Sequence, residues 1–242
     1  MVRISYDLRK RSKSDIYWTG DIMNKNDFAQ MKVSGTEISY SQAHEVQTQY
    51  ALSMIIPTRN EAGNIEPLLT RIDQATRGTA LEVIFVDDST DDTPEVIRSL
   101  QDRFPLRITL IARPPERRKS GLGGAVVEGF KVARAPWVCV MDADLQHPPE
   151  FIPKMLKHAQ KTGSDIVVGS RLAKGGDATS LGLKRTIISQ IFATTTRVTF
   201  PQRLRSVTDP LTGFFILQRA AVNPDDLHPD GFKILLEILV SH

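Results

Sequence analysis

Two aspartates one residue apart, Asp142 and Asp144, follow directly on the apolar run Trp137–Met141. Gln146 lies two residues beyond Asp144 and adds a neutral carboxamide oxygen. Two carboxylates crowded at the end of a buried strand repel each other unless a positive charge lies between them. Hard cations such as Mg²⁺ and Mn²⁺ prefer oxygen ligands and usually share them with substrate phosphates. The spacing therefore predicts a Mg²⁺ or Mn²⁺ site at Asp142, Asp144 and Gln146.

Two other interpretations of this segment deserve comparison with the metal site. His147 is a possible zinc ligand, but no cysteine or second histidine stands at ligand spacing, so we interpret it as a structural residue. The aspartates could also cap a helix, because carboxylates favour a helix N-terminus and Pro148-Pro149 could open the next helix. Capping explains one acid, but not two together with Gln146.

Short apolar runs alternate with longer amphipathic ones from residue 51 onward. Strands are expected at 51–56, 81–86, 106–111, 136–141 and 165–169. Helices are expected near 61–76, 92–103, 121–134 and 149–161. The alternation predicts an α/β fold, with a mostly parallel sheet flanked by helices on both faces.

Ligands of such sheets bind beyond the carboxyl ends of the strands. The segments that follow the expected strands are Pro57-Thr-Arg-Asn-Glu61, Asp87-Asp-Ser-Thr-Asp-Asp92, Asp142-Ala-Asp-Leu-Gln146 and Gly169-Ser-Arg171. They are rich in carboxylates, include a well-placed arginine and have little apolar surface. The shared edge of the sheet is therefore predicted to bind a charged ligand.

The composition suits one large soluble domain with an appendage, since 40% of the 242 residues are hydrophobic and 24% are charged. Residues 1–50 are polar and lack periodicity, so we expect a poorly ordered N-terminal arm in which a short helix could form. The net charge is +3, and the lysines and arginines cluster in patches along the sequence. Such patches could bind phosphates or an anionic membrane surface, or they could simply face the solvent. Since no nucleic-acid motif accompanies them, we expect no nucleic-acid partner.

The cysteine content and the hydropathy bear on the cellular setting. Cys139 is the single cysteine, so no internal disulfide can form and a reducing cytoplasm is the natural setting. Nowhere do about 18 apolar residues follow one another, so no transmembrane helix is expected in this chain.

Two further fold classes match parts of the pattern. A receiver domain of a signalling protein would use Val86-Asp-Asp-Ser89 as its acidic pair and Asp142 as the phosphorylated residue, but it leaves the strand at 51–56 unexplained and needs a later Lys-Pro. A dinucleotide-binding fold would use Gly121-Leu-Gly-Gly124. That motif fails because Val126 replaces its last glycine and no strand stands directly ahead.

Taken together, residues 51–242 resemble the family 2 glycosyltransferases of the GT-A fold, and among them the dolichol-phosphate or polyprenol-phosphate mannose synthases. The resemblance is carried by Ile56-Pro-Thr-Arg-Asn-Glu61, Val86-Asp-Asp-Ser89, Gly121-Leu-Gly-Gly-Ala125, Met141-Asp-Ala-Asp-Leu-Gln-His-Pro-Pro-Glu150, Gly169-Ser-Arg171, Asp209-Pro-Leu-Thr-Gly-Phe-Phe215 and Gly231-Phe-Lys-Ile-Leu-Leu-Glu237. It implies a single Rossmann-like GT-A catalytic domain over 51–242 that is short at its C-terminal end.

The resemblance also implies roles for individual residues. The nucleotide-sugar pocket would comprise Pro57, Arg59, Glu61, Val86, Asp88 and Ala143. Asp142, Asp144 and Gln146 would hold the metal that bridges the diphosphate. Arg171 would face the phosphates with help from Lys184 or Arg185, and Asp142, Asp144 and Arg171 would form the catalytic set. At Arg59 the mannose synthases commonly have tyrosine, although a guanidinium can still stack on a base.

The implied activity is metal-dependent, inverting transfer of a sugar, with GDP-mannose as the first choice of donor, to a polyprenyl or dolichyl phosphate. The chain would then lie peripherally on the cytoplasmic face of a membrane. Within 183–200, one helical face would carry Ile187, Ile188, Ile191, Phe192 and Val198. Such a helix either packs on the core or lies in the bilayer interface, and the resemblance favours the interface.

The sequence stops inside an expected helix at Lys233–His242, where the family continues into a further strand and a basic segment. This leaves a second hypothesis, a truncated module that binds a nucleotide sugar without turning it over.

Overall fold

One sheet runs through the part of the chain that the computed structural model describes, which is residues 2–6, 50–170, 209, 212–228 and 234–241. Its strands are β1 (Val2–Tyr6), β2 (Leu52–Thr58), β3 (Leu81–Asp87), β4 (Arg107–Ala112), β5 (Trp137–Val140), β6 (Ile166–Ser170) and β7 (Phe215–Gln218). Their spatial order is β1-β6-β7-β5-β2-β3-β4.

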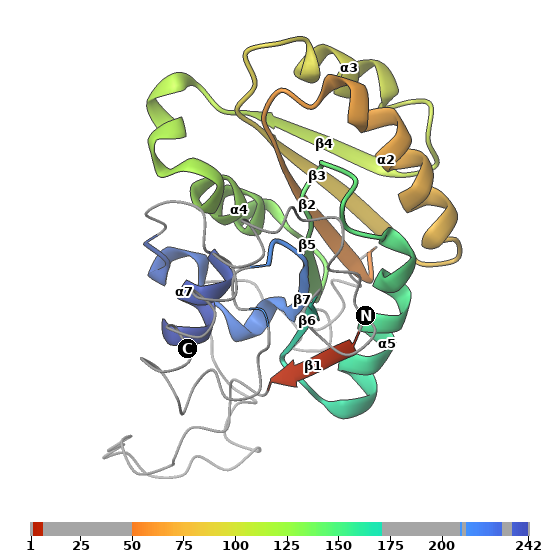
Figure 1. The fold of residues 1–242 in the computed structure, drawn as a ribbon, viewed down its shortest axis with the longest axis vertical. Helices are drawn as coiled ribbons and strands as arrows, with labels where there is room; N and C mark the ends of the chain where they lie inside the picture. The colour runs from red at the N-terminus through yellow and green to blue at the C-terminus, as the bar shows by residue number, and fades with distance from the viewer. Residues whose placement is uncertain (1, 7–49, 171–208, 210–211, 229–233, 242) are drawn as a thin grey trace, which may run out of the picture.

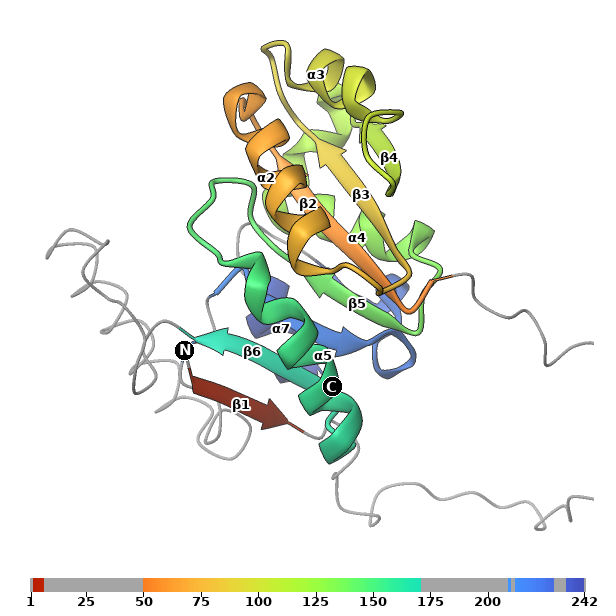
Figure 2. The same ribbon diagram turned by 90° about the vertical axis from the view of Figure 1, so that its right-hand side faces the viewer.

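The strand directions follow from the pairings. β2 pairs in parallel with β3 and β5, and β3 pairs in parallel with β4. β7 runs antiparallel to both β5 and β6, and β1 runs antiparallel to β6. The strands from β2 to β6 therefore share one direction, while β7 and β1 oppose them (Figure 2). The predicted mostly parallel sheet is confirmed.

Three strands form where the sequence is mostly apolar, and their few polar residues, such as Ser53 and Glu82, are buried as well. Every residue of β2, β3 and β6 is buried. Continuous runs of this kind are typical of parallel strands covered on both faces. In β2, neighbouring residues alternate between the faces, so Ile55 belongs to one core cluster and Met54 and Ile56 belong to the other.

Helices cover both faces of the sheet, as predicted (Figure 1). One core cluster joins the sheet to α4 (Gly121–Val132) and α7 (Ile234–Ser241), with Phe130 and Ile238 among its members. The other joins it to α2 (Ala62–Ala75), α3 (Thr93–Leu100) and α5 (Ile152–Thr162), with Leu68, Ile97 and Met155 among its members. No helix among the described residues is both long and apolar enough to cross a membrane.

Some elements differ from the sequence-based expectation. β7 and β1 were not predicted, and β1 lies within the stretch that was expected to be an arm. The helix expected at 149–161 begins as a 3₁₀ turn at Pro149–Phe151, which Pro148 precedes and Pro149 opens. A further 3₁₀ helix, η2 (Pro115–Ser120), separates β4 from α4. The helix expected within 183–200 lies outside the described residues.

Gly129 lets α4 lie directly on β2. A Cβ on this residue would be 2.4 Å from Ile55 Cγ2. Because Ile55 is branched at Cβ and fully buried, it cannot turn away. We expect Gly129→Ala to lower the free energy of unfolding by about 1–3 kcal/mol through overpacking. Urea denaturation measures this change. Gly63→Ala on α2 is the matched control, since no atom lies within 4 Å of its Cβ. A Gly129→Ala variant as stable as Gly63→Ala would contradict the packing.

Candidate functional site

The carboxyl ends of the parallel strands meet at one edge of the sheet, and β7 begins at that edge because it runs the opposite way. Backbone hydrogen bonds just beyond the strands join the segments there. Met141 N donates to Ile55 O at 3.2 Å, Asp88 N to Thr58 O at 2.9 Å, Arg113 N to Asp87 O at 2.9 Å, and Gly169 N to Phe214 O at 2.8 Å. The segments expected to share an edge do so within the described residues.

Asp142 is held between two parts of the chain. On one side, its Oδ2 lies 3.2 Å from His147 Nε2. On the other side, a Cβ placed on Gly213 would be 2.3 Å from Oδ2 and 2.4 Å from Oδ1. His147 is buried and stacks on Phe214, with ring centroids 5.2 Å apart. These contacts are compatible with a structural role for His147, and its contact with Asp142 orients a candidate metal ligand.

Asp144 belongs to a tight turn. Its Oδ1 accepts a hydrogen bond from Gln146 N at 3.0 Å. Leu145 between them has a φ of 61°, a left-handed conformation that few non-glycine residues adopt. Each aspartate thus uses one oxygen on the protein. Among the described residues, no hydrogen-bond partner takes Asp142 Oδ1 or Asp144 Oδ2.

The helix-capping alternative is wrong for these aspartates. The next helical turn begins after Pro148, and no side chain caps it. The pair instead presents two half-buried carboxylates beside a carboxamide. No group of three or more histidine, cysteine or acidic residues that could hold a metal occurs within the described ranges. A partial, all-oxygen shell of this kind fits Mg²⁺ or Mn²⁺, whose remaining ligands are commonly phosphates and water.

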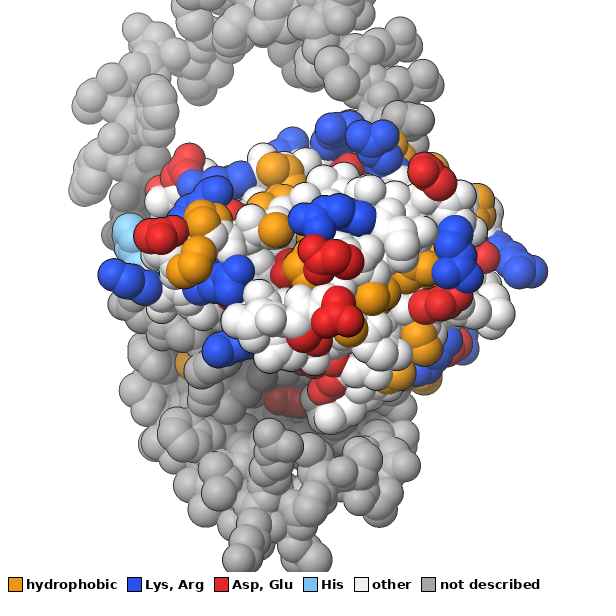
Figure 3. All heavy atoms as spheres, turned by 90° about the horizontal axis from the view of Figure 1, so that it is seen from above, with side chains coloured by type: hydrophobic (Ala, Val, Ile, Leu, Met, Phe, Trp, Pro, Cys, Tyr) orange, Lys and Arg blue, Asp and Glu red, His pale blue; other side chains and the backbone are white. Residues whose placement is uncertain are grey.

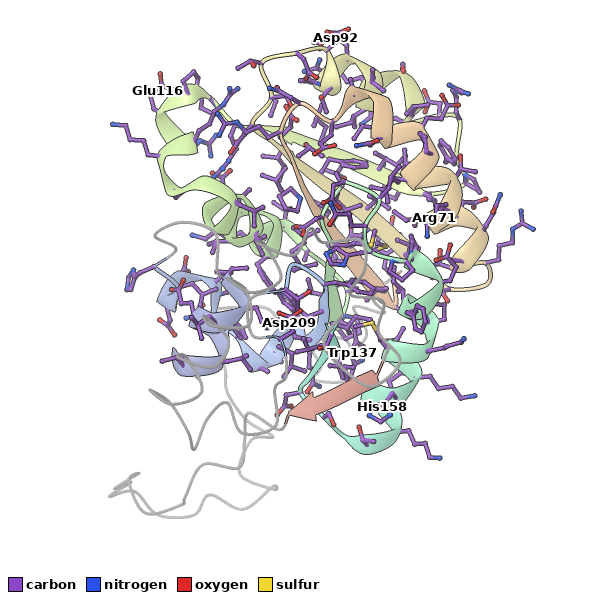
Figure 4. The ribbon with its side chains drawn as sticks, viewed as in Figure 1. Arg71, Asp92, Glu116, Trp137, His158 and Asp209 are labelled. Atoms are coloured by element: carbon purple, nitrogen blue, oxygen red, sulfur yellow. The ribbon has the colours of Figure 1, made fainter. Side chains whose placement is uncertain are left out.

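Arg71 on α2 ties down the loop that carries the aspartates. Its Nε and Nη2 donate to the two carboxylate oxygens of Glu150 at 3.1 and 3.0 Å. Nη1 lies 3.5 Å from Leu145 O. Burial alone would raise the pKa of Glu150, but the hydrogen bonds from Arg71 hold that pKa below its ordinary value. Figure 4 shows Arg71 between α2 and the start of α5.

The turns after β2 and β3 are interlocked. Asn60 N donates to Ser89 Oγ at 2.8 Å, and Thr90 N donates back to Asn60 Oδ1 at 2.8 Å. Glu61 N donates to Thr93 Oγ1 at 2.9 Å. These contacts hold the two turns side by side at the edge of the sheet.

The residues expected to form the nucleotide pocket differ in solvent exposure. Arg59 is exposed and Glu61 is half-buried. Pro57 and Val86 are register partners on β2 and β3 and are buried, as is Ala143. The side chain of Val86 packs into the core, so only its backbone can face a ligand.

Asp88 forms a contact that the sequence analysis missed. Arg113 Nε donates to its Oδ1 at 2.8 Å, and Arg113 Nη2 donates to its Oδ2. The sequence analysis assigned no role to Arg113. Its position directly after β4 was the signal that could have placed it at this edge.

The residues just before β7 contact the end of β6 at the same edge of the sheet. Asp209 and Thr212 are buried. Thr212 Oγ1 donates to Gly169 O at 3.3 Å, which joins the start of β7 to the end of β6. Figure 4 shows Asp209 near the middle of the molecule, whereas Glu116 and Asp92 project outward. Arg171, Lys184 and Arg185 lie outside the described residues.

Charged side chains dominate the neighbouring surface. Figure 3 shows acidic groups running through the middle of the face seen from above, with basic groups around them. Apolar side chains are scattered between them. This surface thus carries charges of both signs, and the binding of a charged ligand beside it stays a prediction.

A mostly parallel sheet with a carboxylate pair at its strand ends is typical of glycosyltransferases of the GT-A fold, and the comparisons with known proteins agree with this class. The model of glycosyl transferase family 2 matches residues 53–224. The chain therefore belongs to glycosyl transferase family 2. This assigns it to a transferase family rather than to the receiver domains.

Within the family, the chain is similar to dolichol-phosphate mannosyltransferases. It is 45% identical over 191 residues to the enzyme of that name from Pyrococcus furiosus, a match that covers 78% of this chain and 52% of the relative. It is 37% identical over 199 residues to the one from Saccharomyces cerevisiae, covering 78% of this chain and 70% of the relative. The chain thus spans about half the length of the archaeal relative.

Solved structures agree on the GT-A fold. Glucosyl-3-phosphoglycerate synthase from Mycobacterium tuberculosis, in complex with Mn²⁺, UDP and glucosyl-3-phosphoglycerate, matches with a TM-score of 0.57 and 20% identity, covering 87% of this chain and 71% of that chain. The mannosyl-3-phosphoglycerate synthase from Rubrobacter xylanophilus matches with a TM-score of 0.50 and 21% identity, covering 71% of this chain and 55% of that chain.

Proposed function

We propose that this chain is the catalytic domain of a metal-dependent, inverting glycosyltransferase that moves a sugar from a nucleoside diphosphate to a polyprenyl or dolichyl phosphate. GDP-mannose is the first choice of donor. The observation that carries the proposal is the pair Asp142 and Asp144 at the carboxyl edge of the sheet, each of which uses one oxygen in a contact with a described residue. The names of the relatives support mannose and the lipid phosphate, and the Mn²⁺ complex supports a divalent cation.

Different residues would bind the metal and the nucleotide sugar. Asp142, Asp144 and Gln146 would hold Mg²⁺ or Mn²⁺, which when bound would neutralise the charge that develops on the departing nucleoside diphosphate. Pro57, Arg59, Glu61, Val86, Asp88 and Ala143 would form the nucleotide-sugar pocket around it. Outside the described ranges, Arg171 would face the phosphates together with Lys184 or Arg185.

The proposed acceptor explains why no strong general base is needed at this edge. The phosphate oxygen of a polyprenyl phosphate is already an anion, so it can attack the anomeric carbon without first losing a proton. The bond from that carbon to the diphosphate breaks as the new bond forms, which inverts the anomeric configuration. We further propose that residues 51–242 form the catalytic domain, that β1 from the N-terminal stretch adds an edge strand to its sheet, and that the domain lies on the cytoplasmic face of a membrane.

A thermal-shift panel tests the binding half of this proposal. We expect GDP to raise the midpoint of unfolding only when Mn²⁺ is present, because a ligand that binds the folded state stabilises it by about 2.7 kcal/mol at 100 times its Kd. UDP, ADP and inorganic phosphate serve as comparison ligands, and Mn²⁺ alone gives the baseline. An equal shift by GDP without metal, or no shift with any nucleotide, would count against the proposal.

A further inference from the structure

The acidic turn after β3 contains one short pattern twice. Asp87-Asp-Ser89 and Asp91-Asp-Thr93 each place a hydroxyl residue two positions after an aspartate. In the first, Ser89 Oγ donates to Asp87 Oδ1 at 2.6 Å and Ser89 N donates to Asp87 Oδ2 at 3.2 Å. In the second, Thr93 Oγ1 and Thr93 N both donate to Asp91 Oδ1, at 2.5 and 3.1 Å. Because each hydroxyl proton is used on a carboxylate, its oxygen is left to act as an acceptor.

The two hydroxyl oxygens accept hydrogen bonds from consecutive backbone N–H groups in the turn after β2. Asn60 N donates to Ser89 Oγ at 2.8 Å, and Glu61 N donates to Thr93 Oγ1 at 2.9 Å. Only residues 59–61 connect the end of β2 to the start of α2. Within them Asn60 has a φ of 59°, a left-handed conformation that few non-glycine residues adopt. The two hydroxyls therefore fix the backbone of a tight turn from a different segment of the chain.

The hydroxyl residues are buried, although the turn that they hold is at the surface. Ser89 is 6% exposed and Thr93 is 0% exposed, whereas Asn60 is exposed. The hydrogen bond from the Thr93 hydroxyl is the main reason why the pKa of the Asp91 carboxyl lies below its ordinary value. Loss of either hydroxyl would leave a backbone N–H of the turn without the acceptor that holds it.

We propose that Ser89 and Thr93 are positioning residues that set the turn 59–61 for the nucleoside part of the donor. This inference rests on the proposed function, which assigns Arg59 and Glu61 to the nucleotide-sugar pocket. The candidate metal ligands follow β5, which pairs with β2 on the side opposite to β3. The two hydroxyls therefore act on the part of the edge that lies away from the metal and the diphosphate.

Calorimetric titration of the whole chain with GDP and with inorganic pyrophosphate, each with Mn²⁺, tests this role. We expect Ser89→Ala and Thr93→Val each to weaken GDP binding by at least about fivefold, the scale of one buried hydrogen bond. Pyrophosphate affinity should stay within about twofold of wild type, because the metal ligands lie on a different segment. Thr70→Val is the matched control, since Thr70 Oγ1 donates to Glu66 O on the exposed face of α2, and it should change neither affinity.

Thr93→Ser separates positioning from packing. Serine keeps the hydroxyl but loses the buried methyl group, so the variant should unfold at a lower urea concentration and still bind GDP within about twofold of wild type. Valine keeps the shape of threonine but loses the hydroxyl, so it should show the full loss of GDP affinity. Equal losses of GDP affinity in Thr93→Ser and Thr93→Val would assign Thr93 to packing and overturn the proposal.

The remaining outcomes distinguish this inference from the function on which it rests. Equal weakening of GDP and pyrophosphate, or unchanged GDP affinity in Ser89→Ala or Thr93→Val, would refute the positioning role alone. If one of these two variants does not fold, the other decides by the same pair of affinities. A wild-type chain that does not bind GDP in the presence of Mn²⁺ would refute the proposed function itself.

Discussion

Asp144→Ala should lower turnover by at least about 10², the scale of losing one electrostatic partner of a transition state. The substitution leaves Asp142 as the single carboxylate of the pair, so the cation and the departing diphosphate are held less well. Turnover is measured with radiolabelled GDP-mannose and a polyprenyl phosphate at saturating Mn²⁺.

Two further variants show whether charge or loop structure causes the loss. Asp144→Asn keeps an acceptor for Gln146 N but removes the charge, so it should be as impaired as Asp144→Ala. Asp102→Ala removes an exposed carboxylate from the turn before β4, at the opposite edge of the sheet, and should leave turnover unchanged. Nearly normal turnover of Asp144→Ala or Asp144→Asn would refute the metal assignment.

Gly213→Ala is the second substitution with a large expected effect. The new Cβ would lie 2.3–2.6 Å from the carboxylate atoms of Asp142, so the two cannot keep their places. Because Phe214 and Phe215 are buried, the backbone at 213 is held and the half-buried Asp142 must yield. A displacement of about 1 Å at a reacting site can cost 10² in rate. We expect a loss of about that size.

The stability of the Gly213→Ala chain distinguishes displacement from unfolding. Gly213 does not have a positive φ, so alanine fits its backbone, and the midpoint of urea unfolding should change little. Gly63→Ala, with open space around its Cβ, should keep both normal turnover and normal stability. Normal turnover of Gly213→Ala would show that Asp142 has no fixed position in the reaction.

The elements that the sequence predicted best are those that are buried on both faces. β2 and β3 are mostly apolar, and α2 between them has clear amphipathic periodicity. β7 gives no comparable signal, because a strand of four residues, three of them apolar, does not reveal that it enters the sheet between β5 and β6 in the opposite direction. Its position nevertheless places Gly213 against Asp142.

In the candidate site, residues that are close in the sequence could be predicted to act together, whereas contacts between residues far apart in the sequence could not. Asp142, Asp144 and Gln146 are close in the sequence, so their spacing alone suggests shared chemistry. Arg113 lies 25 residues from Asp88, and only the pairing of β3 with β4 brings them together. The contact of Gly213 with Asp142 likewise depends on the register of β5 with β7.

Anomalous diffraction from a crystal soaked in MnCl₂ and GDP tests the central claim most directly. The account predicts a manganese peak in contact with carboxylate oxygens of both Asp142 and Asp144 and with the diphosphate of GDP. A structure with GDP bound but no manganese at these carboxylates, and with both aspartates still in contact with His147 and Gln146 alone, would contradict it.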